Sequence, residues 1–266
     1  MADYILPHSI PQEDERLTLM SRMLDPQLFF RLEQVGVAAG WRCLEVGAGN
    51  GSVSHWLAER VGPRGHVVCS DIDTRFLSAL EAPNLEVRRI DVTTDLLGED
   101  YDLVLTRALL HHVPQRIDVL HRLAAAVRPG GILVVEEPDF HPVLATDSPA
   151  LRDFWEGFLA WAASEGIDYF VGRRVAPQLA ASGFDAVAAH GETILFAGGS
   201  LPARYLALTM RELERPLLGS GLVGKTTWTE AMRLLDNEAF WTWQNCYVTT
   251  TARRPETAPS IPAPSA

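Results

Sequence analysis

Apolar runs of strand length alternate with segments of helical periodicity through residues 42–137. A short apolar run is typical of a buried strand, and apolar residues spaced three or four apart are typical of a helix that packs on it. Such an alternation predicts a mostly parallel sheet with helices on both faces. The predicted strands are 42–46, 66–71, 85–90, 102–106 and 132–137, and the predicted helices between them are 52–61, 74–81 and 115–127.

Turn signals and flanking segments complete this pattern. The stretches 62–65 (Gly-Pro-Arg-Gly) and 129–131 (Pro-Gly-Gly) predict turns that lead from a helix into the next strand. Residues 11–40 are expected to form two helical segments broken at Pro26. Further helices are predicted at about 148–165 and 201–238, and further strands near 184–197 and 241–251.

These elements predict three parts of the chain. Residues 1–40 form an N-terminal helical cap, and residues 41–254 form an α/β domain with helical insertions in its C-terminal half. Residues 255–266 are rich in proline, serine and alanine and have little to bury, so we expect this tail to be disordered. A chain of 266 residues with 47% hydrophobic content can bury a large core, which favours one α/β domain with insertions over two independent domains.

Charge and targeting signals narrow the class of partner. The net charge is −11, and Lys225 is the only lysine among 23 basic residues, so no basic stripe is expected to bind nucleic acid. No apolar run reaches the roughly 20 residues that span a bilayer, and the start of the chain does not resemble a signal peptide. We therefore expect a cytoplasmic protein, and its scarcity of lysine indicates a bacterial gene rich in G and C. The cysteines Cys43, Cys69 and Cys246 lack the spacing of metal ligands, so no metal site is predicted.

The first strand ends in a carboxylate that is followed by three glycines at alternate positions: Glu45, Gly47, Gly49 and Gly51. Ligands of a parallel sheet bind outside the carboxyl ends of its strands, and glycine lets the backbone approach a ligand closely. The N–H groups at the start of the following helix suit a carboxylate, and Glu45 suits an ammonium group. An amino acid head group therefore fits this loop better than a pyrophosphate does.

Two further acids follow the next two strands. Asp71 comes about 20 residues after the glycines, where an acid can accept hydrogen bonds from ribose hydroxyls. Asp91 ends the third strand and suits an adenine amino group, with the backbone of Val92 beside it. The predicted ligand is a nucleoside joined to an amino acid. The third glycine of a dinucleotide-binding motif would fall on Ser52, which counts against NAD.

These motifs resemble those of the class I S-adenosylmethionine-dependent methyltransferases over roughly residues 4–250, and in detail those of the ubiquinone-synthesis-like branch and its actinobacterial small-molecule enzymes. The segments that carry the resemblance are LEVGAGNG, VVCSDID, RRIDVT, DLVLTRALLHHV and VRPGGILVVEE, with an N-terminal segment from Tyr4 to Leu17 and the GRR segment Gly172–Arg174. The resemblance implies a Rossmann-like sheet of seven strands whose last strand is antiparallel. It also implies S-adenosylmethionine as cofactor, S-adenosylhomocysteine as product, and Ile72 and Arg107 as further cofactor contacts.

Candidates for proton transfer follow the fourth and fifth strands. A hydroxyl or ammonium acceptor must lose a proton, and the ordinary pKa of histidine suits that task. We predict His111 as the base and Glu136 as a second catalytic residue, with Glu137 as the other carboxylate at the same strand end. A histidine that only hydrogen-bonds its own loop, and glutamates paired with Arg107, Arg173 or Arg174, are the competing interpretations.

The prediction of an acceptor pocket rests on the helix expected at about 148–165. In residues 148–166 large apolar side chains recur at helical spacing, which is typical both of a core and of a pocket wall. The predicted acceptor pocket contains Tyr4, Phe140, Phe154, Phe158 and Trp161.

The predicted function is methyl transfer to a small, largely apolar or aromatic acceptor, with O-methylation favoured over C- or N-methylation. The resemblance implies a role in specialised metabolism. Two alternatives stay open: a cofactor-binding enzyme that catalyses a cyclisation or decarboxylation without methyl transfer, and an inactive partner subunit of the same fold. The sequence leaves the oligomeric state open, with a homodimer as one candidate.

Overall fold

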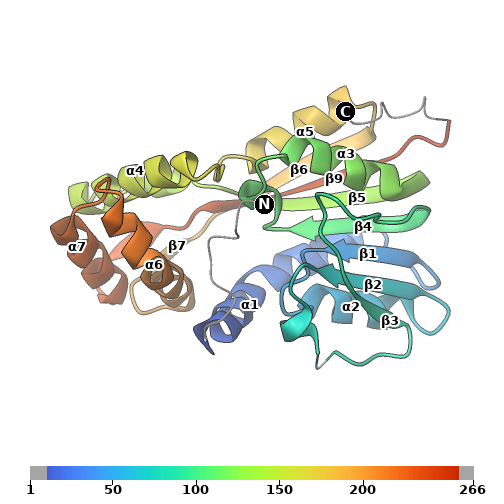
Figure 1. Ribbon diagram of the computed structural model, residues 1–266, viewed down its shortest axis with the longest axis horizontal. Helices are drawn as coiled ribbons and strands as arrows, with labels where there is room; N and C mark the ends of the chain where they lie inside the picture. The colour runs from blue at the N-terminus through green and yellow to red at the C-terminus, as the bar shows by residue number, and fades with distance from the viewer. Residues whose placement is uncertain (1–10, 79, 258–266) are drawn as a thin grey trace. The chain divides into compact units, whose positions relative to one another are not determined.

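The computed structural model describes residues 11–78 and 80–257 (Figure 1). The chain divides into two compact units. Unit 1 contains Met1–Leu24, Pro138–Phe170 and Gly191–Tyr247, and unit 2 contains Asp25–Glu137, Val171–His190 and Val248–Ala266. Among the described residues, no helix combines the length and the apolar character needed to cross a membrane.

The elements alternate between strand and helix along much of the chain. The strands are β1 (Arg42–Val46), β2 (His66–Asp71), β3 (Leu85–Arg89), β4 (Tyr101–Arg107), β5 (Val127–Asp139), β6 (Asp185–Glu192), β7 (Leu195–Ala197), β8 (Trp241–Trp243) and β9 (Cys246–Arg253). The α-helices are α1 (Pro11–Gln34), α2 (Ser52–Val61), α3 (Arg116–Ala126), α4 (Pro149–Ser164), α5 (Gly172–Ala181), α6 (Leu201–Gly219) and α7 (Lys225–Asp236). Short 3₁₀ helices are η1 (Thr74–Leu77), η2 (Leu110–His112) and η3 (His141–Ala145).

A seven-stranded sheet in the order β3-β2-β1-β4-β5-β9-β6 organises the fold (Figure 1). The five strands from β3 to β5 in that order pair in parallel. Arg254, just after β9, exchanges backbone hydrogen bonds with Gly130 and Gly131 near the start of β5. The end of β9 therefore lies beside the beginning of β5, so β9 runs antiparallel to it. These observations confirm the predicted Rossmann-like fold class.

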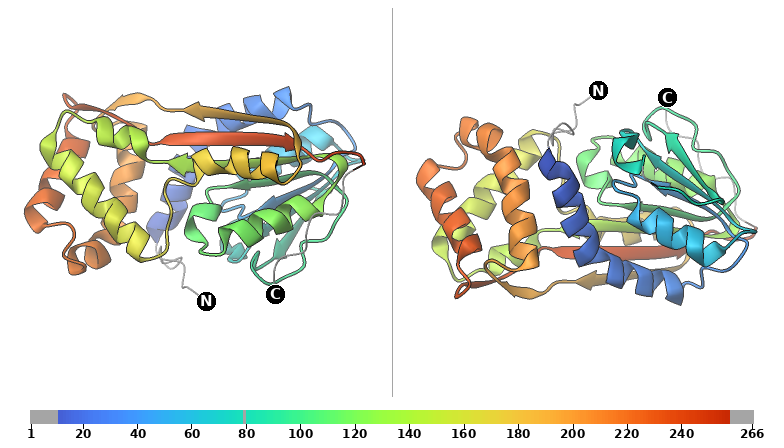
Figure 2. Two further views of the ribbon diagram at one scale, coloured as in Figure 1. Left: turned by 90° about the horizontal axis from the view of Figure 1, so that it is seen from above. Right: turned by 90° about the horizontal axis from the view of Figure 1, so that it is seen from below.

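Side chains of unit 2 alternate between two cores, one on each face of the sheet. Cys43, Leu103 and Leu105 point to the face covered by α2 and by the C-terminal half of α1. Leu44 and Val104 point to the opposite face, which α3 and α5 cover. Figure 2 shows α3 and α5 over the sheet in the view from above and α2 over it in the view from below. A strand buried on both faces needs apolar residues at consecutive positions, which is why Cys43 and Leu44 in β1, and residues 103–105 in β4, are all apolar.

Unit 1 is mainly helical and has an aromatic core. Helix α4 packs on α7, and α6 packs on α7. The strands β7 and β8 form a separate antiparallel pair in which Leu195 lies opposite Trp243.

The prediction of two helical segments in residues 11–40 is wrong, because α1 continues through Pro26 to Gln34. A proline inside a helix removes one backbone hydrogen bond and costs about 3 kcal/mol. Leu28 and Leu32, which follow the proline, are fully buried against the sheet. Their burial offsets the cost, at about 1.5–3 kcal/mol for each side chain.

Four other local predictions need correction. The helix predicted at 74–81 is limited to the 3₁₀ helix Thr74–Leu77. The single helix predicted at 201–238 is two helices, α6 and α7, separated around Gly221, whose φ of 74° interrupts a right-handed helix. Residues 129–131 lie inside β5 rather than in a turn, with a register irregularity opposite them in β4. The helix α5 was not predicted, because Gly172 and Pro177 within it are typical of loops.

Candidate cofactor and acceptor site

The loop between β1 and α2 is shaped by glycine conformations. Gly47, Gly49 and Gly51 have φ angles of 75°, 58° and 73°, which an L side chain rarely adopts. A Cβ at Gly47 would lie 3.3 Å from Leu109, and a Cβ at Gly51 would lie 2.0 Å from Leu80. The positive φ angles therefore favour glycine in this loop, and a side chain at Gly51 would in addition displace the end of the Leu80 side chain. Gly47 and Gly49 stay partly exposed, so their main chain is accessible.

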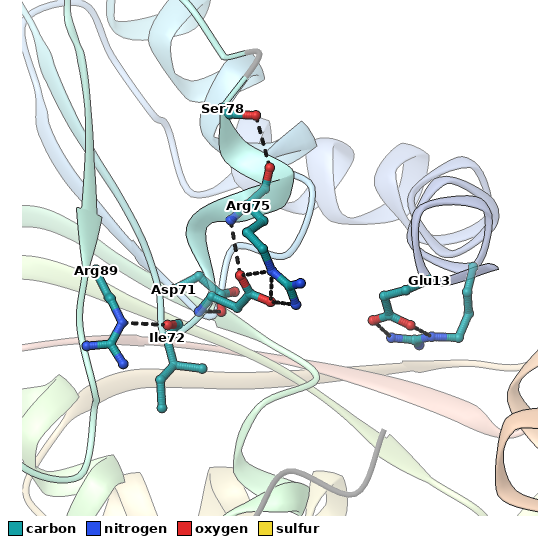
Figure 3. Close-up of polar contacts among 8 residues, drawn as sticks. Glu13, Asp71, Ile72, Arg75, Ser78 and Arg89 are labelled. Atoms are coloured by element: carbon teal, nitrogen blue, oxygen red, sulfur yellow. Dashed lines mark hydrogen bonds and ion pairs between the residues drawn. The ribbon is translucent and has the colours of Figure 1, made fainter. Parts of the chain in front are cut away.

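Asp71 is held against this loop by main-chain hydrogen bonds. The N–H of Gly49 donates to Asp71 Oδ2 at 2.9 Å, and the N–H of Asp73 donates to Asp71 Oδ1 at 3.0 Å. Figure 3 shows Asp71 beside Ile72, with Arg89 directed toward Ile72. The next residue, Ile72, is 42% exposed, and its carbonyl accepts a hydrogen bond from Arg89 Nε at 3.1 Å. The structure thus brings together the glycine loop and the acid at the end of β2, as the sequence predicted for a ribose site.

Asp91 lies at the corresponding end of β3 and forms a turn. Its Oδ1 accepts a hydrogen bond from the N–H of Thr93 at 2.9 Å and another from the Thr93 hydroxyl. These bonds hold the pKa of Asp91 below its usual range. Val92 is 7% exposed and packs in the core that α3 covers.

Glu45 is buried beneath the loop. Its side chain accepts a hydrogen bond from the Ser54 hydroxyl, and its exposed fraction is 1%. Burial raises the pKa of Glu45 to about 7, although the Ser54 hydrogen bond and the charge of Arg107 act in the other direction. At neutral pH this carboxyl can therefore be either charged or neutral, depending on what lies beside it.

Arg107 forms a buried ion pair near the same loop. Its Nη1 lies 2.6 Å from Asp25 Oδ1, and the side chain is 4% exposed. The hydroxyl of Ser52, the first residue of α2, donates to the same Asp25 oxygen at 3.2 Å. Arg107 also acts electrostatically on Glu45 and Glu136, so one cation serves several carboxyl groups.

His111 is paired with Glu137 rather than with Glu136. The Nδ1 atom of His111 lies 2.8 Å from Glu137 Oε2. Glu136 lies opposite Arg107 in the β4–β5 register, and its Oε1 accepts a hydrogen bond from the Thr249 hydroxyl at 2.7 Å. Burial raises the pKa of both glutamates to about 7. The charge of Arg107 and the Thr249 hydrogen bond act in the other direction on the pKa of Glu136, and the backbone hydrogen bonds do so on that of Glu137.

The predicted acceptor residues of unit 1 lie in its aromatic core. Phe154, Phe158 and Trp161 on α4 have exposed fractions of 0%, 0% and 2%, and Phe140 has 5%. The ring of Phe158 lies 6.0 Å from those of both Phe140 and Trp161 between centroids. The structure brings these four residues together in one packed cluster. Tyr4 lies outside the described residues.

Residues 44–133 match the model of a family described as a methyltransferase domain. This range contains the glycine loop, both acids and the His111 loop. Residues 44–133 therefore carry a methyltransferase domain, and the similarity to named methyltransferases supports the class I S-adenosylmethionine-dependent type.

Curated relatives support this assignment to the methyltransferase family. A trans-aconitate 2-methyltransferase of Rhizobium rhizogenes is 30% identical over 110 residues, which cover 41% of this chain and 43% of that protein. A ubiquinone/menaquinone biosynthesis C-methyltransferase, UbiE, of Ectopseudomonas mendocina is 31% identical over 117 residues, covering 41% of this chain and 46% of that protein. The chain thus spans less than half the length of these two relatives.

A solved structure supports the fold over most of the chain. A SAM-dependent methyltransferase from Aquifex aeolicus superposes with a TM-score of 0.52 at 17% sequence identity, covering 92% of this chain and 98% of that one. The methyltransferase fold therefore extends beyond the part of the chain that the family model matches.

The residues of the candidate site fit S-adenosylmethionine. Gly47 and Gly49 carry no side chains and are partly exposed, so a ligand can reach their main chain. The Asp71 carboxyl lies beside this main chain and accepts a hydrogen bond from Gly49. Within residues 11–78 and 80–257, no group of three or more histidine, cysteine, aspartate or glutamate side chains is placed to hold a metal ion.

Sequence reasoning missed one residue of this site, Asp25, and did not resolve which glutamate pairs with His111. It did not single out Asp25, because nothing local in the sequence shows that α1 approaches β4. It named Glu137 but gave the second catalytic role to Glu136, although the alternation of side chains along a strand shows that the two glutamates must point to opposite faces.

Proposed function

We propose that this protein transfers the methyl group of S-adenosylmethionine to a small, largely apolar or aromatic acceptor. The observation that carries the proposal is the accessible glycine loop joined to the Asp71 carboxyl by the Gly49 hydrogen bond of 2.9 Å. Action in the cytoplasm, a role in specialised metabolism and a homodimeric assembly are further parts of the proposal that rest on the sequence alone.

The cofactor is assigned to the ends of β1, β2 and β3. The main chain of Gly47, Gly49 and Gly51 would bind the amino acid part, with Glu45 as the negative charge for its ammonium group. Asp71 and Ile72 would bind the ribose, and Asp91 and Val92 the adenine. Arg107 would act through its electrostatic effect on Glu45.

The chemistry needs alignment and the removal of one proton. When bound, the cofactor would supply a methyl group attached to a positively charged sulfur. On transfer, that sulfur would keep the electron pair of the broken bond and become the neutral thioether of S-adenosylhomocysteine. His111 would take the proton of a hydroxyl acceptor as its oxygen bonds to the methyl carbon. Glu136 has Oε1 bound to Thr249, and its buried Oε2 has no hydrogen-bond partner among the described residues, so Oε2 would accept a hydrogen bond from the acceptor.

The apolar character of the acceptor is inferred from unit 1. Phe140, Phe154, Phe158 and Trp161 would contact it, and the burial of apolar surface would supply most of its binding energy. An acceptor oxygen is favoured because a histidine base is useful only when a proton must leave.

The experiment that tests the proposal compares Asp71→Ala and Asp73→Asn with the wild type by titration calorimetry. Asp71→Ala should weaken S-adenosylmethionine binding by about 1.5–3 kcal/mol, which is the usual contribution of hydrogen bonds to a charged group. Asp73→Asn is the matched control, since Asp73 is a neighbouring acid that is paired with Arg75 at 2.6 Å.

Thermal melts without cofactor should accompany the titrations, because Asp71 also accepts hydrogen bonds from the N–H groups of Gly49 and Asp73. If wild type and Asp71→Ala bind S-adenosylmethionine with equal affinity, Asp71 is not part of the cofactor site. Tighter binding of NAD than of S-adenosylmethionine would overturn the proposed function. A screen with isotope-labelled cofactor and bacterial extract would then identify the acceptor.

A further inference from the structure

Glu137 is a buried carboxyl group whose two oxygens take part in four hydrogen bonds. The N–H groups of Leu109 and Leu110 donate to Oε1 at 2.8 and 2.7 Å. The N–H of His111 donates to Oε2 at 3.2 Å, and the ring atom Nδ1 of His111 lies 2.8 Å from the same oxygen. The exposed fraction of Glu137 is 0%. One side chain thus organises both the backbone after β4 and the imidazole ring.

The local sequence explains why Glu137 and not its neighbour takes this position. Consecutive side chains of a strand point to opposite faces, so Glu136 and Glu137 on β5 must diverge. Glu136 faces Thr249 of β9. The chain turns sharply after β4 at Ala108, whose φ is 53° and whose N–H donates to the carbonyl of Glu136. This turn directs the next three N–H groups toward the Glu137 carboxyl.

The hydrogen bonds restrict where protons can lie. Oε1 already accepts from two backbone N–H groups, so it cannot also carry a proton. Two arrangements remain for the contact between Oε2 and Nδ1: an ionised Glu137 that accepts from Nδ1–H, or a protonated Glu137 that donates to Nδ1. In the first, a neutral imidazole has its lone pair on Nε2. Burial favours the protonated carboxyl and raises the pKa of Glu137 to about 7, whereas the three backbone N–H donors stabilise the ionised carboxylate, so the first arrangement is expected from about neutral pH upward.

We infer that Glu137 is a positioning residue that holds His111 as the Nδ1–H tautomer and so makes Nε2 the atom that receives the acceptor's proton. The inference rests on the proposed function for its catalytic meaning. When Nε2 takes the proton, the ring becomes an imidazolium, and the adjacent Glu137 charge stabilises it. The proton moves from the acceptor to Nε2, and Glu137 itself is neither protonated nor consumed.

The direct test is nitrogen-15 NMR of the imidazole rings in the resting wild-type protein, with His111→Ala used to assign the His111 signals. We expect His111 to be the Nδ1–H tautomer in the neutral range. In Glu137→Gln the amide oxygen can keep the bonds from Leu109 and Leu110, which turns the amide NH₂ toward Nδ1. The tautomer should then reverse to Nε2–H.

Glu136→Gln is the matched control, since it removes the same charge from the adjacent buried residue, whose exposed fraction is 2%. It should leave the His111 tautomer as in the wild type. With an identified acceptor, Glu137→Gln should lower kcat toward that of His111→Ala and leave the affinity for S-adenosylmethionine within about twofold.

The inference is overturned if wild-type His111 is the Nε2–H tautomer, a result that needs no variant to fold. It is also overturned if folded Glu137→Gln keeps the Nδ1–H tautomer or the wild-type kcat. Failure of S-adenosylmethionine to bind would instead refute the proposed function, and the tautomer measurement would still stand as a test of the Glu137 contact.

Discussion

Replacing Arg107 should destabilise the protein strongly, because it leaves several buried carboxyl groups without their common cation. Arg107→Met removes the charge, keeps much of the side-chain volume and cannot pair with Asp25, which now lies 2.6 Å away. The carboxyls of Glu45 and Glu136, on which Arg107 acts electrostatically, lose the same support.

The magnitude follows from the burial of the pair. Two unit charges about 4 Å apart attract each other by about 4 kcal/mol at an effective dielectric constant of about 20. Measured losses on breaking a buried pair are about 3–5 kcal/mol. We expect a loss in this range at pH 8. A smaller loss is expected at pH 6, because Glu45 and Glu136, whose pKa values are about 7, can then be protonated.

The assay is urea denaturation of Arg107→Met, Asp25→Asn and the double variant. Removing both charges should recover part of the loss, with a coupling energy of about 2 kcal/mol. Arg128→Met is the matched control, because Arg128 and Asp102 also lie 2.6 Å apart but the Arg128 side chain is 41% exposed against 4% for Arg107. An exposed pair contributes about 1 kcal/mol or less.

The reasoning would be refuted if Arg107→Met and Arg128→Met lost equal amounts of stability. It would also be refuted if the double variant were no more stable than the sum of the two single losses predicts. Calorimetry on the same variants tests the proposed cofactor role of Arg107. If the role is indirect, the double variant should regain affinity for S-adenosylmethionine along with stability. A direct contact would leave its affinity low.

Two further predictions concern pH and the aromatic core. The pKa of Glu45 rises from an ordinary 4.5 to about 7 in the folded state, so its protonated form contributes stability that is present below about pH 4.5 and is lost as the pH rises through about 7. Urea denaturation at several pH values should therefore show Glu45→Gln gaining up to about 3 kcal/mol of stability relative to the wild type between pH 5 and 8. A stability difference that stays constant with pH would contradict this prediction. Trp161→Ala and Trp228→Ala, which truncate residues 2% and 5% exposed in the same core, should each cost about 3–5 kcal/mol in thermal or chemical unfolding. The acceptor-contact proposal requires Trp161→Ala to raise the acceptor KM more than Trp228→Ala does, and equal KM values would remove Trp161 from the acceptor site.

Local patterns predicted the central strands of the sheet well because these strands are buried on both faces. β1 (Arg42–Val46), β2 (His66–Asp71) and α2 (Ser52–Val61) have the predicted bounds. The glycine loop was also predictable, because a positive φ is a local demand that glycine satisfies by itself. Elements that depend on distant packing were predicted poorly. Pro26 was taken as a helix end, although the burial of Leu28 and Leu32 carries α1 past it.

The sequence by itself determined the fold class and the family resemblance. It also determined the positions of Glu45, Asp71 and Asp91 at the ends of their strands, and parallel strands place their carboxyl ends at one edge of the sheet. It also limited His111 and two adjacent glutamates to the ends of neighbouring strands. Only the tertiary structure decided the pairing, with Glu137 beside His111 and Asp25 beside Arg107. The physical reason is that such pairs join residues 26 and 82 positions apart, and their contact depends on side-chain direction and helix docking that no local pattern encodes.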